Sequence, residues 1–211
     1  MGIDYITHSF KIAAQADPSA KLYYNDFNIE RCCNAKINAT ISMVRTILAA
    51  GAPVHGIGMQ GHSRVGKSPS KRELLDTMAK FSELVDEIAF TEVDIRHTKL
   101  PTSPGDVEQQ AKDYLDVVGA CLETPKCVGI TVWDFTDQYS WIPGQYPGEG
   151  EACLWDRSYN KKPAYTSVVS LLQSAASAGL RGRATSVATA AVHAGGTVTA
   201  ATVKARATRA S

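Results

Sequence analysis

The stretch Ile88–Arg96, with the sequence IAFTEVDIR, decides how the rest of the chain is interpreted. A short run rich in branched and aromatic side chains is typical of a buried strand. Two acids, Glu92 and Asp94, follow its apolar part. A buried carboxylate costs free energy unless it is paired or hydrogen-bonded. On the strand alone two interpretations stand: Glu92 caps a loop while Asp94 makes a surface ion pair, or the acids form a functional site.

Helical and strand patterns alternate on both sides of this stretch. Apolar residues at helical spacing predict helices over 3–13, 37–48, 70–85, 107–121 and 163–172. Runs rich in β-branched or aromatic residues predict strands over 21–25, 54–59, 88–96 and 128–133. Ser70 and Glu73 have the spacing of a capping box, and 134–162 is expected to be a long polar loop. Alternating strands and helices imply parallel pairing with right-handed crossovers, so we predict an α/β fold.

Polar side chains gather where the predicted strands end. They are Asn25, Gln60, His62, Glu92, Asp94, Trp133 and Asp134. In parallel α/β architectures the functional site lies beyond the carboxyl ends of the strands. Four strands that bring polar groups to one rim indicate a site more strongly than any one strand does. Four strand–helix units are also half of a (β/α)₈ barrel.

Length and charge restrict the class of protein. The chain has 211 residues and a formal charge of +1, which suits one domain with a sizeable core. A near-neutral balance argues against nucleic acid or a membrane surface as the partner. No apolar run approaches the roughly 20 residues of a membrane span. The first five residues lack the basic segment and apolar core of a secretory signal.

The composition changes from about Ser174 onward. Ala, Thr, Ser and Gly dominate residues 174–211, and large apolar side chains nearly vanish. Such a segment buries too little surface to offset chain entropy, so we predict one domain over 1–173 and a disordered tail over 174–211. The positive charges of the tail leave a second interpretation, an arm that binds polyanions or cell-wall material.

The five cysteines contain no C-x-x-C pair. Cys121 and Cys127 lie six residues apart across a turn with Pro125, so they are candidates for a short-loop disulfide, which would imply an oxidising compartment. The alternative is two buried free thiols. The neighbours Cys32 and Cys33 are not expected to pair with each other.

Four ordered motifs carry a resemblance to a known family. They are KLYYNDFN at 21–28, GIGMQGH at 56–62, FTEVDI at 90–95 and CVGITVWD at 127–134, with Ser140-Trp141 and KPAY at 162–165 following. Over residues 1–173 the chain resembles the C-terminal half of the catalytic domain of a glycoside hydrolase family 10 endo-1,4-β-xylanase. The resemblance implies a partial (β/α)₈ TIM barrel, about its last four βα units, and a secreted enzyme acting on xylan.

The resemblance also assigns roles to residues at the rim. It makes Glu92 the nucleophile that forms a covalent glycosyl-enzyme in a retaining mechanism, and His62 the group that orients Glu92. Gln60 is expected to support the same network and to bind substrate, and Asn25 to bind sugar hydroxyls. Without this resemblance, His62 would be interpreted as an ordinary loop histidine.

The flat faces of Trp133 and Trp141 suit the apolar face of a pyranose ring, so the resemblance makes them walls of the sugar subsite. Core packing is the alternative for Trp133. Asp94 is expected to support local structure. No cofactor is expected, and no metal site is indicated because His and Cys residues lack ligand spacing.

One element of the family pattern is missing. Retaining hydrolysis needs a second carboxyl group, as acid/base, about 5–5.5 Å from the nucleophile. The family supplies it from a W-x-x-x-N-E motif, which this chain lacks. Glu30, Glu149 and Glu151 are the nearest rim acids, and none is expected to replace it. Three hypotheses follow: part of an active xylanase, a non-catalytic half barrel that binds xylan or self-associates through its open sheet edges, or a βα protein of different chemistry.

Overall fold

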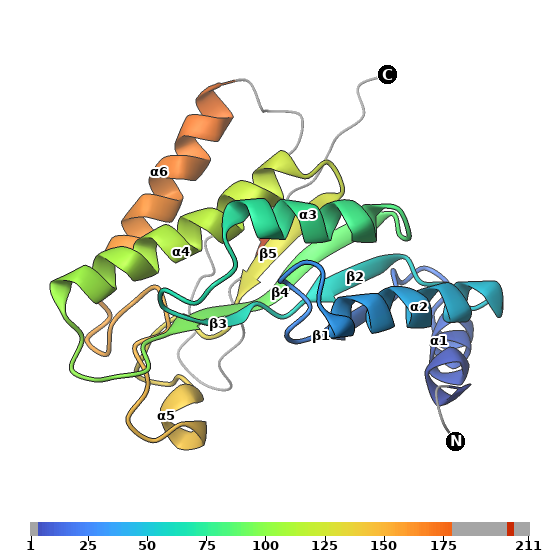
Figure 1. The fold of residues 1–211 in the computed structure, drawn as a ribbon, viewed down its shortest axis with the longest axis horizontal. Helices are drawn as coiled ribbons and strands as arrows, with labels where there is room; N and C mark the ends of the chain where they lie inside the picture. Colours follow the sequence, from blue (N-terminus) through green and yellow to red (C-terminus); the bar gives the residue numbers. More distant parts are fainter. Residues whose placement is uncertain (1–3, 179–201, 205–211) are drawn as a thin grey trace.

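The computed structural model describes residues 4–178 and 202–204 (Figure 1). Its helices are α1 Asp4–Ala16, α2 Ala35–Ala49, α3 Lys71–Ser82, α4 Pro104–Glu123, α5 Ile142–Gln145 and α6 Pro163–Ser177. Its strands are β1 Tyr23–Asp26, β2 Gly56–Met59, β3 His62–Arg64, β4 Glu87–Arg96, β5 Cys127–Val132 and β6 Thr202–Lys204. No helix in the described part of the chain is both long and apolar enough to cross a membrane.

The strands form one sheet in the order β1-β2-β4-β5-β6, with β3 paired to β4. The pairs β1–β2, β2–β4, β3–β4 and β4–β5 are parallel, and helices α2, α3 and α4 connect successive strands and cover one face (Figure 1). The predicted α/β class and its parallel strand–helix units are therefore confirmed. Buried apolar side chains such as Ile57, Phe90 and Phe81 fill the space between sheet and helices.

Local signals in the sequence fix where two helices begin. Ser70 and Glu73 form the predicted capping box of α3, since the Glu73 carboxylate accepts from the Ser70 backbone N–H at 2.9 Å. Ser103 and Asp106 make the same arrangement at α4, where Pro104 occupies the first helical position. These caps satisfy backbone N–H groups that lack partners inside the helix.

The structure corrects the sequence expectations in three places. A short strand, β3, follows β2 where a loop was expected, because His62, Ser63 and Arg64 pair with the extension of β4 beyond the sheet core. The loop over 134–162 contains α5. Residues 174–177, predicted to belong to the tail, continue α6 to Ser177, which suits their high content of alanine and serine in a helix already begun.

Strand β6 lies within the predicted tail and pairs antiparallel with β5. This pairing covers the β5 edge that was expected to be open, so the terminal strands of the described sheet are β1 and β6. The remaining residues of the predicted disordered tail, 178–211 apart from β6, have no described secondary structure, and 179–201 and 205–211 lie outside the described residues.

Two disulfides are present among the described residues. Cys121 at the end of α4 is bonded to Cys127 at the start of β5, with an S–S distance of 2.00 Å. Cys32 is bonded to its neighbour Cys33, so the expectation that these two would not pair is wrong. The backbone of Cys33 has a φ of 72°, an unusual conformation that accompanies the bond between adjacent residues. Cys153 is free and buried.

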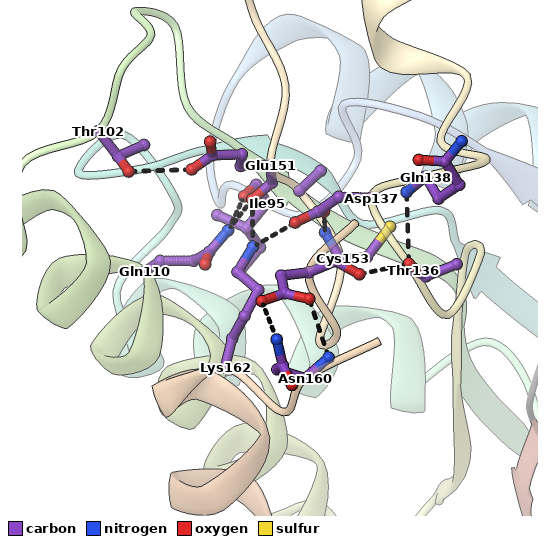
Figure 2. Close-up of polar contacts among 12 residues, drawn as sticks. Ile95, Thr102, Gln110, Thr136, Asp137, Gln138, Glu151, Cys153, Asn160 and Lys162 are labelled. Atoms are coloured by element: carbon purple, nitrogen blue, oxygen red, sulfur yellow. Dashed lines mark hydrogen bonds and ion pairs between the residues drawn. The ribbon is translucent and has the colours of Figure 1, made fainter. Parts of the chain in front are cut away.

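A buried ion pair between Lys162 and Asp137 links the segment 134–162 to the rest of the domain. Figure 2 shows the Lys162 ammonium reaching the Asp137 carboxylate at 3.1 Å and the Glu151 carbonyl at 2.6 Å. The other Asp137 oxygen accepts from the Cys153 backbone N–H at 2.8 Å. The Gln110 side chain of α4 donates to the Ile95 and Glu151 carbonyls at 2.7 and 2.6 Å. This network connects the start of α6 to α4 and to the end of β4.

We expect Lys162→Met to lower the free energy of unfolding by about 3 kcal/mol, because it leaves Asp137 as a buried charge without its partner. Chemical denaturation followed by circular dichroism measures this loss. The double variant Lys162→Met/Asp137→Leu should recover much of the stability, whereas Lys112→Met on the exposed face of α4 should be neutral. A single variant as stable as the parent chain would contradict the role of the pair.

Candidate active site

A β-bulge in β4 positions the candidate nucleophile. Between Phe90 and Val93 strand β4 advances three residues while its partner β5 advances two, so β4 carries one extra residue at Thr91–Glu92. The buried apolar side chains change from the even positions, Ile88 and Phe90, before the bulge to the odd positions, Val93 and Ile95, after it. Bulges of this kind re-aim a side chain at a strand end. Thr91 and Glu92 consequently reach the same neighbour on β1.

That neighbour is Asn25. Its side-chain amide donates to Glu92 Oε1 at 3.0 Å, while its oxygen accepts from the Thr91 hydroxyl at 2.7 Å. Gly58 lies between them on β2, in register with Asn25. A Cβ atom at Gly58 would lie 2.7 Å from Asn25 Oδ1 and 2.9 Å from Thr91 Cγ2, so only glycine leaves room for this contact. Asn25 thus lies at the rim, as predicted, and contacts the carboxylate directly.

His62 lies between two carboxylates. Its Nε2 is 3.2 Å from Glu92 Oε2, and its Nδ1 is 2.9 Å from Asp94 Oδ1. The second contact is within ion-pair distance but lacks hydrogen-bond angles, so we treat it as an interaction of charges. Pairing of β3 with β4 sets His62 opposite Asp94 and so determines this geometry. The predicted proximity of His62 to Glu92 is thus present in the structure.

The charge state of His62 follows from these neighbours. Burial alone would lower its pKa, but the contact with Asp94 and its charge, followed by those of Glu92, outweigh burial and raise the pKa of His62 above 6.5. An imidazolium at this position offsets the two negative charges. Because the pKa is higher in the folded than in the unfolded state, this contribution to stability is present below pH 6.5 and is lost as the pH rises through the folded pKa.

Two indole rings flank His62. The Trp141 ring lies 5.1 Å from the imidazole, and the Trp141 Nε1–H donates to Asp94 Oδ2 at 2.7 Å. The Trp133 ring lies 6.2 Å from the imidazole, nearly perpendicular to it. Trp133 is 38% exposed, so it is not a core residue. Asp94 is only 1% exposed and holds both His62 and Trp141, so its structural role extends to the site itself.

Gln60 contributes through its backbone. Its carbonyl accepts from the Glu92 backbone N–H at 2.9 Å, and its own N–H donates to the Asp26 carbonyl at 3.0 Å. The residue also lines a cavity of about 750 Å³ next to the site, together with His62 and Trp141. Gln60 therefore contacts Glu92 through its backbone, and the role of its side chain in the network and in substrate binding stays a prediction.

The three rim acids have structural partners. Glu30 is 7% exposed and accepts from the Gly61 backbone N–H at 2.8 Å, and burial raises the pKa of its carboxyl group. Glu149 forms an ion pair with Arg96 at 2.6 Å. Glu151 accepts from the Thr102 hydroxyl at 2.9 Å. The expectation that none of the three serves as the acid/base stays a prediction.

Sequence reasoning missed the packing behind Trp141. The Tyr146 ring lies 5.8 Å from the Trp141 ring, and the Arg96 guanidinium lies 4.1 Å above Tyr146. Arg96 is held in turn by Glu149. The sequence position of Arg96, four residues after Glu92, gives no indication that its side chain stacks on Tyr146. Thr91 was also missed, although the shift from even to odd apolar positions in β4 is a visible signal of the bulge. Among residues 4–178 no three His, Cys, Asp or Glu side chains gather as metal ligands.

We expect Asp94→Asn to lower the pKa of His62 more than Glu92→Gln does, because Asp94 makes the larger favourable contribution to the imidazolium. Titration of the His62 ring signals by NMR spectroscopy measures both values. The His8 signal, from α1, is the internal control. A larger effect of Glu92→Gln would show that Glu92, and not Asp94, determines the charge of His62.

The fold and the site together define a class of protein. A carboxylate at the end of a parallel strand, held by an amide and an imidazole beside two indoles, fits one half of the two-carboxylate site of a glycoside hydrolase. Residues 1–171 match the sequence model of Glycosyl hydrolase family 10, and the chain belongs to this family. The predicted partial (β/α)₈ TIM barrel and the resemblance to the C-terminal part of the catalytic domain are thereby confirmed.

Individual relatives agree with this assignment. The chain is 50% identical over 176 residues to endo-1,4-beta-xylanase 5 of Pyricularia oryzae, and 48% identical over 171 residues to endo-1,4-beta-xylanase 1 of Humicola insolens. The alignments cover 83% and 81% of this chain but 43% and 40% of those proteins. The chain therefore spans less than half the length of these relatives.

Solved structures give the same result. A glycosylated endo-beta-1,4-xylanase of Gloeophyllum trabeum superimposes with a TM-score of 0.76 at 43% identity, over 82% of this chain and 53% of that chain. Xylanase 10B of Thermotoga petrophila, solved in complex with xylobiose, gives a TM-score of 0.76 at 35% identity, with 82% and 53% covered.

Proposed function

We propose that this chain carries the nucleophile side of the active site of a retaining endo-1,4-β-xylanase, with Glu92 as the nucleophile. The observation that carries the proposal is the Glu92 carboxylate, with one oxygen at 3.0 Å from the Asn25 amide and the other at 3.2 Å from His62. Two fixed partners orient a carboxylate for attack on one carbon atom. The xylobiose complex of the Thermotoga petrophila relative supports xylan as the substrate.

The chemistry follows from the geometry. Glu92 attacks the anomeric carbon of a xylose residue as the bond to the leaving sugar oxygen breaks, and a glycosyl ester forms. Water then attacks the same carbon and releases Glu92. Asp94 and Glu92 raise the pKa of His62, and the protonated imidazole offsets the charge of Glu92 before the ester forms and after it is hydrolysed. Trp133 and Trp141 hold the sugar ring against the carboxylate by contact with its apolar face.

Proton transfer to the leaving sugar needs a second carboxyl group. Glu30, Glu149 and Glu151 are engaged by Gly61, Arg96 and Thr102, so the proposal assigns this step to none of them. Formation of the glycosyl ester remains testable with a substrate whose leaving group departs without a proton. The chain as it stands is therefore expected to react with activated glycosides and to hydrolyse xylan poorly without a proton donor.

A xylan-binding or self-associating half barrel is the alternative. The free edge of β1 and the exposed indole of Trp133 are the observations that favour it. For either function we propose an oxidising, extracellular setting, supported by the Cys121–Cys127 disulfide.

Incubation with a 2,4-dinitrophenyl 2-deoxy-2-fluoro-β-xylobioside tests the proposal. The fluorine slows breakdown of the ester, so the intact mass should increase by one fluoro-xylobiosyl group, and peptide mapping should place that group on Glu92. Glu92→Gln should remain unlabelled, whereas Glu108→Gln, on the exposed side of α4, should be labelled like the parent chain. Labelling of another residue would refute Glu92 as the nucleophile, and no labelling with retained xylan binding would favour the non-catalytic alternative.

A further inference from the structure

The cavity beside the Glu92 site is lined by an excess of cations. Four of its lining residues are basic, and they are Arg31, Arg64, Lys67 and Arg96. Its acidic lining residue is Glu30, whose carboxylate is buried and bonded to the Gly61 N–H. The cavity also contains His62, whose charge is balanced by Glu92 and Asp94. The surplus charge therefore lies with the lysine and the arginines.

Two of the four cations are already paired. Arg31 Nη1 lies 2.5 Å from the Glu73 carboxylate, and Arg96 Nε lies 2.6 Å from Glu149. Their positive charges are thus largely offset within the protein. The Arg96 guanidinium also lies 4.1 Å above the Tyr146 ring.

The other two cations, Arg64 and Lys67, are exposed, and within residues 4–178 neither has a carboxylate within ion-pair distance. Their backbone is nevertheless fixed. Arg64 is in register with Arg96 on β4, and the Lys67 N–H donates to the Arg64 carbonyl at 2.9 Å. The Lys67 carbonyl accepts from Arg31 at 2.9 Å, and the Gly66 N–H donates to Asp113 at 2.7 Å. A rigid loop thus holds two unpaired cations at the rim of the cavity.

We propose that Arg64 and Lys67 bind the carboxylate of a uronic acid branch on the xylan chain, so that this cavity selects acidic xylan over unsubstituted xylan. This inference rests on the proposed function, because it adds a substrate class to the same site. The cavity shares His62 and Trp141 with the Glu92 site, so the proposal places the branch in this cavity and the reacting sugar against Glu92. A volume of about 750 Å³ accommodates a sugar residue together with its substituent. Guanidinium and ammonium groups are the usual partners of carboxylates.

Calorimetry with the full chain tests the inference. The ligands are xylotetraose, xylotetraose with one glucuronic acid branch, and free glucuronate. At low salt the branched sugar should bind about fivefold more tightly than xylotetraose, the effect of two exposed charge pairs. The difference should vanish at about 1 M salt, where the Debye length is about 3 Å. Arg64→Gln/Lys67→Gln should abolish the preference, and Lys112→Gln should retain it.

The other outcomes would overturn the inference in distinct ways. Equal affinity for the two oligosaccharides would remove it and leave the labelling of Glu92, and so the proposed function, intact. A preference that survives in Arg64→Gln/Lys67→Gln would exclude these residues as its source. Free glucuronate bound as tightly as the branched sugar would indicate a simple anion site. Binding of neither oligosaccharide would also refute the inference, and the Glu92 label would then decide the proposed function separately.

Discussion

The imidazole of His62 shares its two nitrogens between Glu92 and Asp94, and the remainder of the site is arranged around this contact. A cation between two partly buried carboxylates lowers the electrostatic cost of having them close together. Without it, two acids on adjacent inward positions of one strand would repel each other in a region of reduced dielectric. The short strand β3 places His62 between Glu92 and Asp94, since its three residues pair only with the end of β4.

Two features of the sheet make room for that arrangement. The extra residue in β4 brings Thr91 and Glu92 to the same neighbour, and the missing side chain at Gly58 lets Asn25 lie against both. A regular strand would have directed one of these side chains into the helices. A larger residue on β2 would have displaced the amide. The geometry of the carboxylate therefore depends on the backbone of three neighbouring strands.

The sequence predicts much of this arrangement. Period-3.6 patterns locate the helices, runs rich in β-branched or aromatic residues locate the main strands, and the resemblance to the family predicts Glu92, His62, Asn25 and both indoles as neighbours. Strand β3 was missed because a three-residue strand that pairs only at its partner's end has no periodicity of its own. The Cys32–Cys33 bond was missed because adjacent cysteines rarely bridge, and the stacking of Arg96 on Tyr146 because it joins distant segments. The roles of these residues in catalysis remain predictions.

One carboxylate oxygen of Asp94 accepts a hydrogen bond from the Trp141 indole, and the other lies next to the His62 imidazole. The platform that a sugar rests on and the group that steadies the nucleophile are therefore joined through a single buried side chain. A sugar ring that fits poorly against Trp141 would displace Asp94 and His62, and the orientation of the Glu92 carboxylate would change with them. Discrimination between sugars at Trp141 would then appear in the rate constant for glycosidic bond cleavage more than in the binding affinity.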